Sequence, residues 1–354
     1  MLEWKKLGDI CDIGTGSNNR EDACENGLYP FFVRSKEVLR IDSYLYDEEA
    51  ILIPGEGGIG EIFHYVNGKY GLHQRTYRVH PISRNVVGKF LYYYLFENFK
   101  KYIDQKSFKS TAASIRKPML FDFPVVIPSP SEQTRIVGIL DTFTASIENL
   151  KQQIAERRKQ YEYYRDQLLD LEGKEGVEIG SFAKFVKDRI AASELTSRNY
   201  TSVENLLKNK AGRQDAENVP TEGNWIKYDK GDVLIGNIRP YLRKIWLSDR
   251  EGGTNGDVIV IRTNDKYLPE YVFYCLASER FFLYYNQALK DGKMPRGEKK
   301  RVLSFVIPAI DIAKQSGIVS ILDTFEASIA NLEAQLKERE KQYEYYRNKL
   351  LTFE

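Results

Sequence analysis

Apolar residues recur at alternating steps of four and three through two segments of this 354-residue chain. This spacing predicts two long amphipathic helices whose apolar stripes form a coiled-coil seam. The first stripe spans 36 residues, so each helix would be a rod about 54 Å long at ~1.5 Å per residue. The stripe positions are Ile136, Leu140, Phe143, Ile147, Leu150, Ile154, Tyr161, Tyr164, Leu168 and Leu171 in the first copy, and Ile318, Leu322, Phe325, Ile329, Leu332, Leu336, Tyr343, Tyr346, Leu350 and Phe353 in the second.

The two stripes belong to an internal repeat with an offset of 182 residues. Residues 139–150 read ILDTFTASIENL, and residues 321–332 read ILDTFEASIANL. Each stripe is interrupted once, by Arg157 in the first copy and by Arg339 in the second. A polar residue in a seam can fix register and partner. In the alternative reading, both arginines lay their stems on the seam and reach water.

The segments before the two helices share a common set of predicted strands and helices but differ in their polar stretches. Their Gly-, Asn-, Lys- and Ser-rich stretches differ entirely, which is typical of one fold that carries two different recognition surfaces. The matched segments are strands at 50–54 and 232–236, aromatic helices at 90–95 and 271–276, and strands entering the long helices at 125–128 and 305–308.

We therefore predict an α+β protein with two mixed α/β domains and two long helices. The domains cover residues 1–130 and 176–310, and the helices cover residues 131–175 and 311–354. For the two seams to bury each other, the second helix must fold back antiparallel. The prediction is an antiparallel coiled coil that separates the two domains with pseudo-two-fold symmetry.

Charge and cysteine usage narrow the class of protein. The net charge is only +2, and the basic excess sits in residues 1–130 and 173–310, which weakly favours nucleic acid as a partner. No apolar run approaches the roughly 20 residues that span a bilayer. The N-terminus lacks an export pattern, and the three cysteines are odd in number and widely spaced. We expect a cytoplasmic chain with reduced thiols.

A glycine-rich segment imitates a dinucleotide-binding motif. Residues 55–60 (GEGGIG) fit G-x-G-x-x-G after a strand, but that fingerprint must open a helix. Residues 61–66 instead alternate like a strand and run into Asn67 and Gly68, a hairpin-turn pair. The segment is interpreted as a glycine loop near DNA or as a plain turn.

The sequence indicates no catalytic site and no metal site. It contains no G-x-x-x-x-G-K-[ST], no H-E-x-x-H, no paired CxxC and no Asn/Asp-Pro-Pro-Tyr/Phe tetrapeptide. His64, His73 and His80 alternate rather than cluster at metal-ligand spacing. We interpret these histidines as strand or surface residues.

Basic side chains collect just before the closing strand of both domains, with Arg116 and Arg296 in corresponding places. Lysine and arginine neutralise phosphates, and arginine also reads base edges. A solvated surface is the alternative for any one cluster. The candidate DNA-binding residues are Arg34, Arg75, Lys106, Lys109, Thr111, Arg116, Lys117, Arg239, Arg243, Lys244, Lys293 and Arg296.

Together these features resemble the specificity subunit of type I restriction-modification systems over essentially the whole chain. In the second copy Lys314 replaces Glu132, and residues 294–296 (MPR) replace the polar stretch at 110–115. The matching motifs are residues 126–128 (VIP), Glu132, Gln133, Ile136 and residues 139–141 (ILD), and then residues 306–308, Gln315, Ile318 and residues 321–323.

The resemblance implies two target-recognition domains joined by two long conserved helices. It implies double-stranded DNA as a partner, together with two modification subunits that methylate adenine and ATP-dependent restriction subunits that cleave. S-adenosylmethionine, ATP and Mg would belong to those subunits, with no cofactor on this chain and no membrane contact. Two different domains on a spacer predict an asymmetric bipartite target, and about 54 Å covers roughly one and a half turns of duplex.

Two other classes compete with this interpretation. One is a coiled-coil interaction scaffold with two peptide-binding domains, which would show no salt-sensitive duplex binding. The other is an autonomous nuclease or methyltransferase, and the missing motifs argue against it.

Overall fold

The computed structural model describes residues 3–106, 114–287, 289 and 294–353. The chain forms two compact units, Met1–Gln152 with Glu333–Glu354, and Gln153–Leu332. Each long helix contributes to both units, because both boundaries fall inside a helix. The two units are described separately below.

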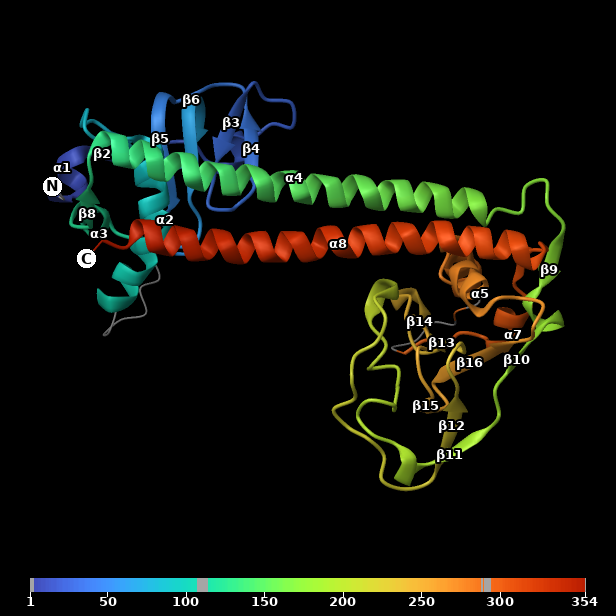
Figure 1. Ribbon diagram of the computed structural model, residues 1–354. Helices are drawn as coiled ribbons and strands as arrows, with labels where there is room; N and C mark the ends of the chain where they lie inside the picture. The colour runs from blue at the N-terminus through green and yellow to red at the C-terminus, as the bar shows by residue number, and fades with distance from the viewer. Residues whose placement is uncertain (1–2, 107–113, 288, 290–293, 354) are drawn as a thin grey trace. The chain divides into compact units, whose positions relative to one another are not determined.

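The first unit is built on a mixed six-stranded sheet in the order β2-β7-β5-β6-β3-β4 (Figure 1). A separate antiparallel pair joins β1 to β8, the strand that leads into the first long helix. The strands are β1 (Glu3–Lys6), β2 (Cys11–Thr15), β3 (Tyr29–Phe32), β4 (Val38–Ile41), β5 (Tyr46–Pro54), β6 (His64–Leu72), β7 (Thr76–Pro81) and β8 (Pro124–Ile127), and the helices before the long one are α1 (Leu7–Ile10), α2 (Gly88–Lys106) and α3 (Lys117–Phe121).

The core of this unit forms between α2 and the sheet. Leu91, Leu95 and Phe99 recur every four residues along α2 and are buried in the same cluster as Ile51 and Ile53 of β5. Residues three or four apart share one face of a helix, so the helix predicted near residues 90–95 buries one continuous stripe.

The second unit has a four-stranded sheet, β10-β16-β13-β14, and a three-stranded sheet, β11-β12-β15. Strand β17 enters the second long helix and pairs with β9, as β8 pairs with β1. The strands are β9 (Gly176–Glu178), β10 (Ala183–Phe185), β11 (Arg189–Ala191), β12 (Asn224–Tyr228), β13 (Val233–Gly236), β14 (Ile245–Leu247), β15 (Gly252–Thr254), β16 (Val258–Thr263) and β17 (Val306–Pro308), and the shorter helices are α5 (Pro269–Leu276), α6 (Glu279–Asn286) and α7 (Lys299–Leu303).

The two predicted long helices are present as α4 (Pro130–Leu168) and α8 (Ile312–Leu351) (Figure 1). The prediction was wrong at their ends, because Leu171 and Phe353 lie beyond the last helical residues. After α4, Lys174 Nζ donates to the carbonyl of Leu168 at 3.1 Å, and Gly173 has a φ of +67°. A lysine that caps terminal carbonyls and a left-handed glycine are ordinary helix stops. Among the described residues, no helix has the length and apolarity to cross a membrane.

Aromatic rings bring the predicted stripes together within each unit. In the first unit, Phe143 of α4 stacks on Tyr346 of α8, with ring centroids 5.4 Å apart. In the second unit, Phe325 of α8 stacks on Tyr164 of α4 at 5.6 Å. The same pair of residue types is therefore used twice, with the two helices exchanging roles.

The two arginines that interrupt the stripes lie over these phenylalanines. The guanidinium carbon of Arg339 is 5.7 Å from the ring centre of Phe143, and that of Arg157 is 6.0 Å from Phe325. Both arginines are partly buried. Each therefore makes a cation–π contact across the helix pair instead of leaving a gap in it.

A fully buried glutamine fastens the first domain to α4. Gln133 Oε1 accepts a hydrogen bond from Val87 N–H at 2.8 Å, and its Nε2 donates to the carbonyls of Asn85 and Pro128, both at 2.8 Å. This amide satisfies the backbone before α2 and the backbone before α4 together. Gln133 of the Glu132-Gln133 motif thus links the domain to α4, a structural role that the sequence pattern alone did not assign.

Gln315, which matches Gln133, makes the same connection in the second unit. Its Oε1 accepts from Leu268 N–H at 2.8 Å, and its Nε2 donates to the carbonyls of Lys266 and Ile310 at 3.1 and 2.9 Å. Each domain is thus joined to the start of its long helix by one amide side chain.

The aspartates of the repeated ILD motifs add a second matched link. Tyr93 of α2 donates to Asp141 at 2.7 Å, and Tyr274 of α5 donates to Asp323 at 2.6 Å. The aromatic helix of each domain is therefore tied to the long helix by a phenol–carboxylate hydrogen bond as well as by packing.

The predicted hairpin turn at Asn67 and Gly68 is wrong. Both residues lie inside β6 and pair with Glu49 and Glu48 of β5 in an uninterrupted register. Pairing with residues 46–52 of β5 keeps this segment extended, and Gly68 accommodates a φ of +123° within it. The connection between β5 and β6 is the glycine loop itself.

Replacing Gln133 with leucine should destabilise the first domain at its junction with α4. The variant leaves Val87 N–H and two carbonyls without partners, which costs about 3 kcal/mol. Hydrogen-exchange mass spectrometry should show faster exchange over residues 85–95. Gln160→Leu, at an exposed position of the same helix, is the control and should leave that exchange unchanged; equal effects would contradict the assignment.

Candidate nucleic-acid interface

In the first domain, three loop segments meet at the residue that follows the central strand β5. Gly55 N–H donates to the carbonyl of Arg75 at 2.9 Å, and its carbonyl accepts from Ile115 N–H at 2.8 Å. These bonds join the glycine loop, the turn before β7 and the segment before α3. Side chains from distant parts of the sequence are thereby placed on one backbone frame.

The second domain contains the same three-segment frame after β13. Asn237 N–H donates to the carbonyl of Asp257 at 2.8 Å, and its carbonyl accepts from Gly297 N–H at 3.0 Å. All three positions match those of the first domain at the repeat offset of 182. The backbone is shared between the domains although the side chains on it differ.

This frame corrects the predicted correspondence of Arg116 with Arg296. It aligns Ile115 with Gly297, and α3 with α7, so Arg116 matches Glu298. Arg296 lies two residues earlier in the frame than expected. The basic composition of both segments concealed this shift, which only the backbone hydrogen bonds define.

In the first domain, two of the predicted arginines share one carboxylate. Nη1 of Arg34 and Nη1 of Arg75 each donate to Oε2 of Glu56 at 3.0 Å. The hydrogen bond from Arg75 is the main cause that lowers the pKa of Glu56 below its usual range, so this carboxylate is ionised at neutral pH. All three side chains are more than one third exposed, and each guanidinium carries further N–H donors.

His73 holds the turn that carries Arg75. It is buried, and its Nδ1 accepts a hydrogen bond from Arg75 N–H at 3.0 Å. Burial lowers the pKa of His73, and Arg34 and Arg75 lower it further. The imidazole is therefore neutral at pH 7, as an acceptor at Nδ1 requires. A cavity of about 170 Å³ opens here, lined by Arg34, Glu56, His73 and Arg20 among others.

The other predicted residues of the first domain lie on the third segment of the frame or before it. Arg116 and Lys117 are exposed at the start of α3. Lys106 is the last residue of α2, and its side chain lies outside the described residues, as do Lys109 and Thr111.

The remaining histidines match their interpretation as strand residues. His64 Nε2 is 3.0 Å from the carbonyl of Ser35, and His80 Nδ1 is 2.7 Å from that of Glu49. Within the part of the chain that the structure describes, no group of His, Cys, Asp and Glu could hold a metal ion.

In the second domain, the frame borders a cavity of about 420 Å³. Arg239 and Lys244 line it with Asp257, and Arg296 Nη2 donates to Asp257 Oδ1 at 2.9 Å. Three of the predicted basic residues, Arg239, Lys244 and Arg296, thus come together here, although Arg239 and Arg296 are 57 positions apart in the sequence. The sequence did not single out Asn218, Asn255 or Met294, which also line this cavity.

Arg239 and Arg243 both adopt left-handed backbone conformations, with φ of 50° and 53°. Such conformations cost a non-glycine residue ~1–2 kcal/mol, and strain of this kind concentrates at functional sites. Arg239 lines the cavity, whereas Arg243 donates to Glu279 at 2.5 Å. Lys244 Nζ donates to the carbonyl of Val203, and burial lowers its pKa. Lys293 lies outside the described residues.

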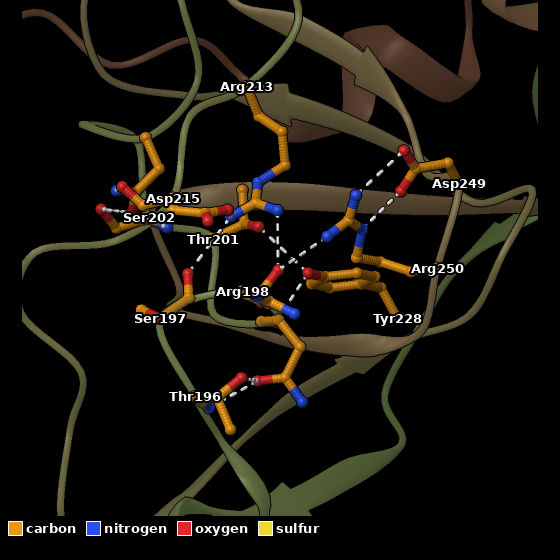
Figure 2. Close-up of polar contacts among 12 residues, drawn as sticks. Thr196, Ser197, Arg198, Thr201, Ser202, Arg213, Asp215, Tyr228, Asp249 and Arg250 are labelled. Carbon is orange, nitrogen blue, oxygen red and sulfur yellow. Dashed lines mark hydrogen bonds and ion pairs between the residues drawn. The ribbon is translucent and has the colours of Figure 1, made fainter.

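Sequence analysis missed one further basic group, which Figure 2 shows. Nη1 of Arg213 and Nη1 of Arg250 both donate to the carbonyl of Arg198, at 2.7 and 3.4 Å. Arg213 is almost fully buried under this loop and lies over the ring of Trp246. The exposed side chain of Arg198 thus projects from a loop that is fixed from beneath. The three arginines are too far apart in sequence to form a visible cluster.

Comparison with known proteins finds relatives that cover most of the chain. The family described as Type I restriction modification DNA specificity domain matches residues 1–157. The Escherichia coli type I restriction enzyme EcoDI specificity subunit is 24% identical, over 95% of this chain and 84% of the relative. A putative type I specificity subunit of Haemophilus influenzae is 25% identical, over 99% and 96%. The chain is similar to type I restriction-modification specificity subunits over nearly its whole length. Its role is DNA specificity, and the peptide-binding scaffold is not favoured.

The fold of the chain is also similar to that of a solved protein. The S subunit of the type I restriction-modification system from M. genitalium superposes with a TM-score of 0.67 at 16% identity, covering 100% of this chain and 97% of the other. At this identity the likeness concerns the fold alone: mixed α/β domains with long helices.

Replacing Arg239 with glycine should weaken duplex binding without unfolding the specificity subunit. Glycine tolerates the left-handed backbone, so the free energy of unfolding should change by less than about 1 kcal/mol. DNA affinity should fall about tenfold or more, because a well-placed arginine contact contributes ~1–3 kcal/mol. Arg243→Gly is the matched control, because Arg243 has the same left-handed backbone but is not among the residues that line the cavity. Equal affinity losses in fluorescence anisotropy titrations would show that Arg239 does not face DNA.

Proposed function

We propose that this specificity subunit reads an asymmetric bipartite DNA target, with residues 1–130 reading one half-site and residues 176–310 reading the other. The observation that carries the proposal is the duplicated three-segment frame, centred on Gly55 and on Asn237. One backbone geometry presented twice with different side chains suits two different base sequences. The basic residues around each frame would neutralise the adjacent phosphates.

We further propose that residues 131–175 and 311–354 form an antiparallel coiled coil with pseudo-two-fold symmetry, which sets the gap between the half-sites. The exchanged stacking pairs, Phe143 with Tyr346 and Phe325 with Tyr164, support this arrangement. The matched contacts of Arg157 and Arg339 also support it.

In this proposal the specificity subunit is not itself catalytic. Two modification subunits would bind it and methylate adenine with S-adenosylmethionine, and restriction subunits would join them for cleavage with ATP and Mg. The absence of nucleotide-binding and methyltransferase motifs from the sequence supports this division of labour. The same division makes methylation by the assembled complex the most direct readout of the target.

Exchanging residues 1–130 for the corresponding domain of another specificity subunit should change one half-site only. The junction falls at the start of α4, so the seam is preserved. Methylome sequencing of cells that express the chimera with the modification subunits should show new bases on one side of the gap. The reciprocal exchange of residues 176–310 should change the other side. Altered bases on both sides from a single exchange would contradict the proposal.

Deleting one heptad from both long helices should shorten the gap. Removing residues 148–154 and 330–336 keeps the seam in phase and shortens the rod by about 10 Å, which corresponds to roughly three base pairs. Methylome sequencing should find the same half-sites at a shorter spacing, or no methylation if the altered rotation prevents both domains from binding. Deletion from one helix alone misaligns the seam and is the control. If the double deletion leaves the gap unchanged, the long helices do not set the spacing between the half-sites.

A further inference from the structure

Each frame carries an ion pair, and the pair is shifted by one segment between the two domains. In the first domain the acid, Glu56, directly follows Gly55, the central residue of the frame. Arg75 lies on the second segment. In the second domain Asp257 occupies the position that matches Arg75, and its arginine partner, Arg296, comes from the third segment. The second segment thus carries the donor, Arg75, in the first domain and the acceptor, Asp257, in the second.

A carboxylate is an unexpected group at a surface that binds a polyanion. Bare acids repel phosphates, but arginine partners neutralise both of these. Glu56 has two, Arg34 and Arg75, and Asp257 has Arg296. Exposed ion pairs add little to folding stability, so stability alone does not account for the same ion pair on both frames.

The backbone under these side chains is held in place. His73 fixes the turn that carries Arg75. In the second domain, the buried Asn237 accepts a hydrogen bond from Tyr285 at 2.6 Å through Oδ1, and Asp257 N–H donates to Asn255 at 3.1 Å. Groups on a fixed backbone lose little conformational freedom on binding, which favours discrimination between similar ligands.

Base edges in the major groove differ in their donors and acceptors. A carboxylate only accepts, so it selects the exocyclic amino group of cytosine or adenine, whereas a guanidinium only donates and selects guanine or thymine oxygens. A fixed carboxylate also repels those oxygens, which adds discrimination against the wrong base.

We propose that Glu56 and Asp257 are specificity-determining residues that each accept a hydrogen bond from an amino group of cytosine or adenine in their own half-site. The paired arginines hold each carboxylate in place and supply donors to neighbouring bases. This inference rests on the proposed reading of one half-site by each domain. The shift of the ion pair by one segment makes the two domains select different base patterns from a common backbone.

The test is Glu56→Gln in the full chain, assembled with its modification subunits. Glutamine both donates and accepts, so the preference for an amino group over a carbonyl should relax at one base of the first half-site. The expected loss of preference is about 5- to 150-fold, the fold-change equivalent of ~1–3 kcal/mol. The second half-site should be unchanged. Asp257→Asn should give the converse result.

The readout is the base composition of DNA retained from a duplex library randomised over both half-sites. Because this readout measures base preference and not affinity, a variant that binds weakly still gives a result. Glu61→Gln is the matched control, since Glu61 lies on the same glycine loop and is an exposed acid paired with Lys100. It should leave the preference intact.

Weaker retention with the base preference unchanged would overturn the inference, because it would show that Glu56 only positions its arginines. An unchanged preference with unchanged retention would overturn it as well. Neither result would affect the bipartite reading itself, which fails only if the domain exchange leaves both half-sites as they were.

Discussion

The pair of backbone hydrogen bonds at the residue after each central strand is the constraint on which the recognition surface depends. Through Gly55 and Asn237, three loop segments from distant parts of each domain are held in one register. Because the bonds use main-chain atoms, the side chains of the segments can differ without loss of the frame. The structure therefore separates two tasks: the backbone fixes position, and the side chains supply chemistry. This separation explains how one fold can carry two unlike surfaces in a single chain.

A second set of polar contacts joins each surface to the long helices. Gln133 and Gln315 are fully buried, and each uses its amide to satisfy backbone groups from two elements. Such groups are costly to leave unpaired, so the amide resists rotation of a domain about the start of its helix. Any spacing set by the helices is useful only if it is passed on to the recognition loops, and these junctions provide the rigidity for that.

A surface that reads DNA must attract the duplex and also discriminate between base sequences, and the charges on the frames suit both requirements. Excess arginine and lysine provide non-specific attraction, which falls steeply with salt. Discrimination needs groups that reject some bases, and an acid neutralised by arginine can do this without repelling the duplex. In our proposal Glu56 and Asp257 do this from neighbouring segments of two matched frames.

The sequence by itself determined which helices and strands form. Periodicity of the apolar residues predicted the heptad stripes, the repeat, the aromatic helices and the strands that enter α4 and α8, because burial of one face of an element imposes that periodicity. The sequence also pointed to Arg34, Arg75, Arg239 and Lys244 as candidate DNA-binding residues. The tertiary structure decided which groups those residues contact. Long-range pairing with β5 kept Asn67 and Gly68 inside a strand against their local turn preference, and backbone bonds aligned Arg116 with Glu298 instead of Arg296. The convergence of Arg198, Arg213 and Arg250, and the pairing of Glu56 with two arginines, depend on contacts between segments far apart in the chain, which no local pattern encodes.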